Sequence, residues 1–226
     1  MTENNRYGSF NEHIVHLQAL YNEFEMFIIK FGEKYLFLDD LSNIDQSFVE
    51  ESAADDNGQD ISNYDFSNDG FKSTVTTQMG GSSTRSSSVD LRQKMALRFR
   101  KIAEVYNTYA DKLHELLDKP ELEQLDSLMR RYESITNNWI SSAIKALHCI
   151  KSRPNCLNIL ISSSPLIKTL SKVMLFKLSP YFAVNNIYSY TKSTKEHILN
   201  RVVNRYGTAC PYIIIGKSDD QNISQK

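Results

Sequence analysis

The spacing of apolar residues changes near Asn155, and this change divides the chain into two kinds of structure. Before Asn155, apolar side chains recur every three or four residues, as they do along one face of a helix. After it, three short apolar runs (157–161, 185–188 and 212–215) alternate with two helical patterns. This order predicts an α/β fold in which parallel strands are joined by right-handed helical crossovers.

We expect helices with buried apolar faces in the first part of the chain. One apolar stripe runs from Ile14 to Phe31, and a second runs from Leu91 to Leu116. A break at Pro120 precedes a third stripe, which runs from Leu122 to Leu147. Residues 72–88 include the run MGGSSTRSSS, whose composition is typical of a mobile loop.

The composition argues against nucleic acid and membranes as direct partners. The 226 residues carry a net charge of −1, so the chain as a whole has no electrostatic attraction to nucleic acid or to an anionic membrane. One basic run, 92–101, is interpreted as the solvated face of an amphipathic helix. No apolar stretch approaches the ~18 residues that a membrane helix requires.

Cysteine usage and the N-terminal sequence predict an intracellular location. Cys149, Cys156 and Cys210 are odd in number and form no Cys-x-x-Cys pair, as expected for reduced thiols in the cytosol or nucleus. The start of the chain has neither the basic residues nor the apolar stretch of a signal peptide. We therefore expect the protein in the nucleus and cytoplasm.

An acidic segment imitates the opening of a calcium-binding EF-hand loop. Asp65, Ser67, Asp69 and Gly70 match its first positions, but the twelfth position is Thr76. Because an EF-hand needs a bidentate glutamate at that position, we do not expect calcium binding.

Hydroxyl and lysine side chains follow the predicted strands. Ser162, Ser163 and Ser164 end the first strand, and Thr191 and Lys192 follow the second, with Lys195 nearby. Ligands of open α/β sheets bind beyond the carboxyl ends of the strands, where helix N-termini also attract anions. The pattern therefore predicts an anion site at this edge of the sheet.

Helix boundary signals accompany these strands. Ser164 is expected to cap the first helix, with Pro165 as its first residue. Ser193 to Glu196 matches a capping box for the second helix, and Gly207 is placed to end it.

The last strand runs into Gly216-Lys217-Ser218, which resembles the end of a phosphate-binding P-loop. That motif requires a glycine five residues before the Gly-Lys pair, and Pro211 occupies the position. The intervening residues 212–215 form a strand pattern, and no helical pattern follows. A nucleotide-binding P-loop is therefore excluded.

Several long segments of the sequence closely resemble the C-terminal domain of Eyes absent proteins. The resemblance runs in order from about Tyr7 to Gly216. It is carried by DDNGQDISNYDFSNDGF (55–71), RKIAEVYNTY (100–109), KALHCIKSRPNCLNILISSS (145–164), LSKVMLFKLS (170–179), NNIYSYTKSTKE (185–196) and RVVNRYGTACPYIIIG (201–216).

The resemblance implies a phosphatase core of the haloacid-dehalogenase type with a helical cap domain inserted after its first strand. We accordingly expect a large helical cap over 1–150, with a mobile loop at 72–88, and a partial parallel-sheet core over 151–226. Eyes absent proteins are Mg²⁺-dependent protein-tyrosine phosphatases that act through an aspartyl-phosphate. They are also transcriptional coactivators that bind Six-type homeodomain proteins. The implied partners are thus a phosphotyrosine protein and a Six-type protein.

Two phosphate-stabilising residues are implied by position. The hydroxyl that binds the transferring phosphoryl group matches Ser163, with Ser162 as the rival. The lysine that steadies nucleophile and phosphate matches Lys195, with Lys192 as the rival. Positioned donors and cations of this kind stabilise the negative charge of phosphoryl transfer.

The sequence departs from the family at two other motifs. The family motif W-D-L-D-E-T supplies the nucleophile and the general acid/base, but residues 1–38 contain no Asp-x-Asp. The family's metal-binding aspartate corresponds to Lys217, which leaves Asp219 and Asp220 as weak metal candidates. The family's last strand and helix have no counterpart after this motif.

We therefore expect the chain as written to be inactive. The alternative interpretations are a non-catalytic protein-interaction module and a fragment of a longer active protein.

Overall fold

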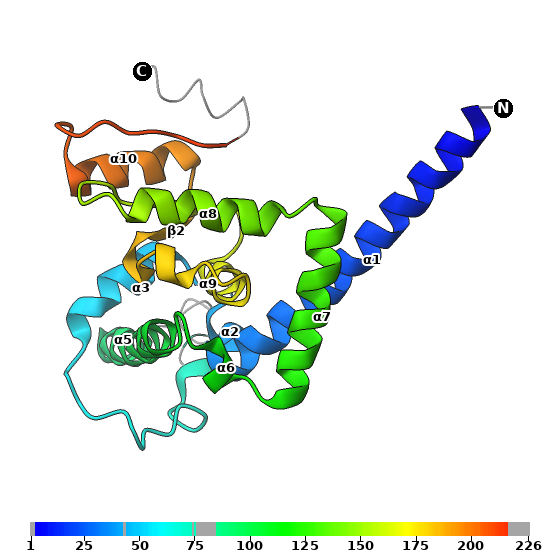
Figure 1. The fold of residues 1–226 in the computed structure, drawn as a ribbon. Helices are drawn as coiled ribbons and strands as arrows, with labels where there is room; N and C mark the ends of the chain where they lie inside the picture. The colour runs from blue at the N-terminus through cyan, green and yellow to red at the C-terminus, as the bar shows by residue number, and fades with distance from the viewer. Residues whose placement is uncertain (1–2, 43, 74, 76–84, 217–226) are drawn as a thin grey trace.

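The structure is a computed structural model that describes residues 3–42, 44–73, 75 and 85–216 (Figure 1). Its helices are α1 (Glu3–Tyr35), α2 (Leu38–Leu41), α3 (Gln46–Ser52), α5 (Arg85–Thr108), α6 (Leu113–Leu116), α7 (Lys119–Ile135), α8 (Trp139–Lys151), α9 (Leu166–Leu175) and α10 (Lys195–Tyr206). The 3₁₀ turns are η1 (Ala53–Asp55), η2 (Ser179–Tyr181) and η3 (Val184–Asn186), and the strands are β1 (Leu160–Ser162) and β2 (Ile187–Ser189).

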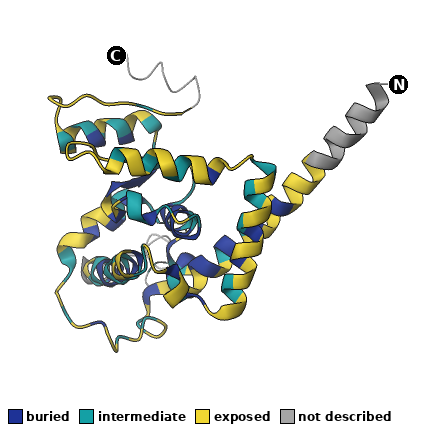
Figure 2. Cartoon of the chain, in the orientation of Figure 1, coloured by how far each residue is buried: buried dark blue, intermediate teal, exposed yellow. Residues whose placement is uncertain are grey.

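One apolar core joins the long helices to the sheet. It contains Phe24 and Ile28 of α1, Ile102 of α5, Leu128 of α7 and Leu170 of α9, all buried. The inward faces of these helices are therefore dark in Figure 2, as burial of their apolar stripes requires. The division expected at residue 150 falls at the end of α8, and the apolar core continues across it.

The N-terminal half of α1 projects from the rest of the molecule (Figure 1). Ile14, Leu17 and Tyr21 are exposed there, so the prediction that the whole Ile14–Phe31 stripe is buried is wrong. The rest of α1 packs against α7 and α9, where Glu23 pairs with Arg131 and Glu25 pairs with Lys168. The stripe is buried only where these neighbouring helices cover it.

The third predicted helix is divided in two. Asn137 and Asn138 have φ angles of 54° and 62°, a left-handed conformation that ends α7 and turns the chain into α8. Trp139, expected in the core, is consequently 69% exposed. The start of α7 follows the sequence signal, since Pro120 lies in its first turn and Asp118 and Glu121 form a capping box.

The two strands pair in parallel, and helices cover both faces of the sheet. Leu160 pairs with Ile187, and Ser162 pairs with Ser189. Successive β2 residues face opposite ways: Ile187 joins the large core that contains α9, whereas Tyr188 packs with Ile198 of α10. The predicted α/β character is confirmed in this coarse form, within a mostly helical molecule.

The third predicted strand does not form. Residues 212–215 have no regular structure, and the side chains of Ile213 and Ile215 are each 87% exposed. A strand is stabilised by its ladder bonds to a neighbour, and within the described residues β1 pairs only with β2. Apolar, β-branched sequence alone therefore did not make a strand here.

Some helix boundaries also differ from expectation. Helix α9 begins at Leu166 with Pro165 as its N-cap residue, so Ser164 does not cap it. Thr194 caps α10 in place of Ser193, and Gly207 ends it at a φ of 82°. Helix α5 begins at Arg85, inside the loop expected at 72–88.

No helix of the described segments combines the length and apolarity needed to cross a membrane.

Candidate functional site

The predicted anion site lies at the carboxyl ends of β1 and β2. The backbone N–H of Tyr190 donates to the carbonyl of Ser162 at 3.0 Å, which extends the pairing just past the strands. Ser163 follows β1 directly, and Lys195 is the first residue of α10, the helix that follows β2. The structure therefore places both candidates beyond the same edge of one parallel sheet.

Hydroxyl groups connect the two strand ends. The Ser189 hydroxyl donates to the carbonyl of Ser164 at 2.8 Å and lies 2.8 Å from the hydroxyl of Thr191. The Thr191 hydroxyl in turn donates to the carbonyl of Ser163 at 3.4 Å. These bonds tie the residues after β2 to the serine turn after β1.

Ser162 and Ser163, the two candidates for the phosphate hydroxyl, differ in availability. Ser162 Oγ accepts hydrogen bonds from the Ser164 N–H and from Thr169 Oγ1, both at 3.1 Å. Ser163 is exposed, and no described residue bonds to its hydroxyl. Ser162 therefore has an internal structural role, whereas the Ser163 hydroxyl can donate to a ligand.

The two lysine candidates also differ. Lys195 is half-buried in the first turn of α10, where the Thr194 hydroxyl accepts from the His197 N–H at 3.2 Å. Lys192 is exposed and lines a small pocket together with Gln46, Ser189 and Thr191. Neither Ser163 nor Lys195 lines this pocket, so the pocket lies beside the predicted anion site.

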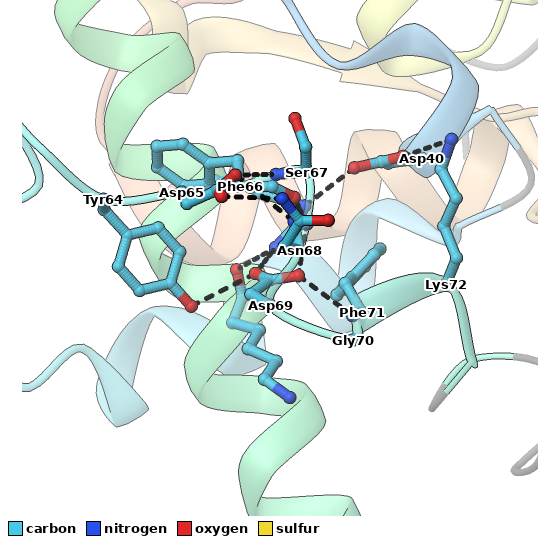
Figure 3. Close-up of polar contacts among 12 residues, drawn as sticks. Asp40, Tyr64, Asp65, Phe66, Ser67, Asn68, Asp69, Gly70, Phe71 and Lys72 are labelled. Atoms are coloured by element: carbon cyan, nitrogen blue, oxygen red, sulfur yellow. Dashed lines mark hydrogen bonds and ion pairs between the residues drawn. The ribbon is translucent and has the colours of Figure 1, made fainter.

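A second polar cluster, which the sequence did not reveal, surrounds Arg98 of α5. Figure 3 labels its acidic members, Asp40 and Asp69. Arg98 is only 1% exposed, although we expected its basic run to face solvent. Its NH1 and NH2 groups donate to Asp69 at 2.6 and 3.0 Å, and its Nε donates to Asp40 at 2.9 Å. The guanidinium also lies 4.0 Å from the ring centre of Phe71. The sequence feature that could have indicated this cluster is the acidic segment 55–69, whose charge is opposite to that of the basic run 92–101.

This cluster occupies the acidic segment that resembled an EF-hand loop. Asp69 also accepts from the Phe71 N–H, and Asp65 accepts from the Ser67 N–H. Burial opposes ionisation of Asp69, but the hydrogen bonds and charge of Arg98 outweigh it and hold its pKa below the usual value. The guanidinium of Arg98 thus pairs with a carboxylate that an EF-hand loop would offer to a metal ion. No group of three or more His, Cys, Asp or Glu side chains suited to a metal occurs among the described residues.

Comparison with known proteins places the chain in a family. It is 36% identical to the Protein phosphatase EYA2 of Homo sapiens over 222 residues, which cover 98% of the chain. It is 40% identical over 115 residues to the Protein phosphatase EYA3 of Gallus gallus, covering 51% of the chain and 97% of that relative. The chain belongs to the Eyes absent family. The Protein phosphatase eya of Drosophila melanogaster is another Eyes absent relative, 36% identical over 138 residues (61% of the chain, 18% of the relative).

The chain spans less than half of the length of several of these Eyes absent relatives. The matched segment is 41% of the human EYA2 protein. No protein-family model matches the chain.

The magnesium ion of the Eyes absent resemblance does not fit the described side chains at this edge. The side chains of residues 162–164 and 189–195 supply hydroxyls and the ammonium groups of Lys192 and Lys195, and no carboxylate occurs among them. One carboxylate, Asp45, lines the neighbouring pocket, where it accepts from the N–H and the hydroxyl of Ser47. Mg²⁺ is bound in proteins chiefly through carboxylates, phosphates and water. Lys217, Asp219 and Asp220 lie outside the described residues, so the expected metal position is not placed by the structure.

Proposed function

We propose that the carboxyl edge of β1 and β2 is the phosphate-binding part of a protein-tyrosine phosphatase site of the haloacid-dehalogenase type. Ser163 donates its hydroxyl to a phosphoryl oxygen, and Lys195 supplies a positive charge. The observation that carries this proposal is the exposed Ser163 hydroxyl, which lies beyond the same sheet edge as the N-terminus of α10.

The chemistry of phosphoryl transfer explains why these groups suit the task. Negative charge is spread over the phosphoryl oxygens in the transition state, so positioned donors and cations stabilise it. The N-terminus of α10 adds a partial positive charge near Lys195. A charge-assisted bond from lysine to a phosphate oxygen forms whether or not a nucleophile is present.

We further propose that a polypeptide of residues 1–226 binds phosphate without hydrolysing phosphotyrosine. In an aspartyl-phosphate reaction, a carboxylate oxygen forms a bond to phosphorus while the bond from phosphorus to the tyrosine oxygen breaks. The expected nucleophile motif, Asp-x-Asp, does not occur in residues 1–38, and Lys217 stands where a metal ligand is expected. Hydrolysis therefore requires a carboxylate that this polypeptide does not supply at the matching position.

Protein interaction is the second candidate function. The N-terminal half of α1 exposes Ile14, Val15, Leu17 and Tyr21. The described part of this projecting helix is mostly yellow, the colour of exposed residues, in Figure 2. Apolar side chains gathered on an exposed helix favour a protein partner. A Six-type homeodomain protein is the partner we propose, acting with the chain in the nucleus. Loss of its binding in the double variant Ile14→Glu/Leu17→Glu, measured by calorimetry, tests this candidate.

Phosphate titration followed by two-dimensional NMR tests the main proposal. We expect inorganic phosphate to shift the backbone signals of Ser163 and Lys195 in a saturable way. Ser163→Ala and Lys195→Met should weaken this binding, whereas Ser134→Ala and Lys145→Met, at exposed positions on α7 and α8, should not. Shifts elsewhere in the chain, or equal weakening by all four variants, would contradict the proposal.

A further inference from the structure

Gln46, the first residue of α3, contacts the outer edge of β2. It is only 8% exposed, and its side-chain amide makes three hydrogen bonds. Oε1 accepts from the backbone N–H of Ser189 at 2.7 Å. Nε2 donates to the carbonyl of Ile187 at 3.1 Å and to Glu50 at 2.9 Å.

The amide of Gln46 takes the place of a peptide group from a third strand. Ile187 and Ser189 are alternate residues, so their N–H and C=O groups point to the same side of β2. The opposite side pairs with β1. Gln46 therefore satisfies a donor and an acceptor that would otherwise be left unpaired at the buried edge of β2.

These bonds lead directly to the proposed phosphate edge. Ser189, whose N–H is held by Gln46, uses its hydroxyl to bind the Ser164 carbonyl and to contact the Thr191 hydroxyl. Thr191 donates to the carbonyl of Ser163. The Thr191 N–H also donates to the Ser189 hydroxyl oxygen at 3.4 Å. Gln46 and the carbonyl of Ser163 are thus the two ends of one chain of hydrogen bonds through Ser189 and Thr191.

A second route connects Gln46 to the helix that carries Lys195. Glu50, which accepts from Gln46, also forms an ion pair with Arg201 of α10. The guanidinium of Arg201 lies 5.8 Å from the ring centre of Tyr188 in β2. Helix α3 consequently contacts both elements that present the candidate site, the end of β2 and α10.

We infer that Gln46 is a positioning residue, which fixes the serine turn after β1 relative to the start of α10. The inference rests on the proposed phosphate site. A neutral amide suits this role because it donates and accepts at the same time. A carboxylate can accept from Ser189 but cannot donate to Ile187, and it would lie beside Glu50.

The test compares Gln46→Glu and Gln46→Met with wild type and with the control Gln124→Glu, at an exposed position on α7. Phosphate affinity is measured by NMR at about pH 7.5 and about pH 5, between which a buried carboxyl with a raised pKa becomes protonated. We expect both Gln46 variants to bind phosphate about tenfold more weakly at the higher pH, the effect of losing about one buried hydrogen bond.

The pH profile separates positioning from a general loss of packing. A protonated carboxyl can again donate to Ile187, so the deficit of Gln46→Glu relative to wild type should shrink at the lower pH. The deficit of Gln46→Met should stay constant, and Gln124→Glu should show none. Wild-type affinity in both Gln46 variants, or equal pH dependence in both, would overturn the inference.

A variant at the far end of the hydrogen-bond chain covers the case in which the Gln46 variants do not fold. Thr191 is exposed, so Thr191→Val should fold while losing the bond to the Ser163 carbonyl. We expect it to weaken phosphate binding, and Thr191→Ser, which keeps a hydroxyl, to restore it. Equal affinities in these two variants would contradict the positioning chain.

Amide hydrogen exchange distinguishes failure of this inference from failure of the proposed function. Absence of phosphate binding in wild type would remove the proposed site but would leave the positioning measurable. Faster exchange at Ser189 together with shifted signals at Ser163 and Ser164 in Gln46→Met would then support positioning. Unchanged signals at Ser163 and Ser164 would overturn it.

Discussion

Arg98 and Asp69 form a bidentate ion pair in which neither side chain is more than 6% exposed. Two parallel bonds, at 2.6 and 3.0 Å, join the guanidinium of α5 to the loop that ends at Phe71. Because a buried charge is costly unless it is paired, each partner holds the other in place. This pair fixes a long irregular segment against the helical core.

Replacement of Arg98 should therefore destabilise the fold strongly. Arg98→Met leaves Asp69 buried without its partner, and we expect a loss of about 3–5 kcal/mol in the free energy of unfolding. Arg92→Met is the matched control, because the Arg92 side chain is 41% exposed where it pairs with Asp55 and should cost less than about 1 kcal/mol. Urea unfolding measures both. Equal losses in the two variants would contradict the buried pair.

The Asp69 carboxylate should also make stability depend on pH. Burial raises its pKa, but the bonds and charge of Arg98 outweigh burial and lower it. Its contribution is therefore fully present above the unfolded value of about 3.9 and is lost as the pH falls through the lower folded pKa. We expect the stability difference between wild type and Asp69→Asn to shrink at acid pH. A difference that grows as pH falls would contradict this sign.

The exposed 212–215 segment predicts an unequal response to substitution. Ile213→Thr and Ile215→Thr should change the free energy of unfolding by less than about 0.5 kcal/mol, since both side chains are already in water. Ile187→Ala, at a fully buried position of β2, should cost about 2–5 kcal/mol. Thermal unfolding of the three variants provides the comparison. A large loss at Ile213 would indicate that this segment is a paired strand after all.

Local sequence patterns predicted much of the helical structure. Periodic apolar residues located the long helices, Pro120 marked the start of α7, and Gly207 marked the end of α10. The two strands that form also lie close to their predicted positions, at 160–162 and 187–189. These features depend on residues near one another in the chain, which is why a sequence reading can find them.

Features that depend on distant partners were missed. Arg98 is buried because Asp69 and Asp40 lie 29 and 58 positions away in the sequence, a pairing that no local pattern reveals. The 212–215 run lacks a neighbouring strand, and the Asn137–Asn138 break requires two left-handed residues in succession. The contacts of Gln46 could not be predicted from local sequence, because they are made with β2, which lies far away along the chain.

The candidate site was predicted more by resemblance than by pattern. The strand-end rule led to the edge that carries Ser163 and Lys195, but it did not rank the neighbouring serines. Their hydrogen bonds do so, because Ser162 is engaged with Ser164 and Thr169 while Ser163 is exposed. The catalytic roles of Ser163 and Lys195 stay predictions.

We expect residues 1–226 to bind a phosphorylated tyrosine at the Ser163–Lys195 edge without cleaving it. Adding a phosphotyrosine peptide and Mg²⁺ to the purified chain, and recording protein and phosphorus NMR signals together, tests this most directly. We predict saturable shifts at Ser163 and Lys195 that are lost in Ser163→Ala, while the peptide stays phosphorylated. Release of inorganic phosphate that EDTA abolishes, or an unperturbed Ser163 at saturating peptide, would rule out a site that binds phosphotyrosine without cleaving it.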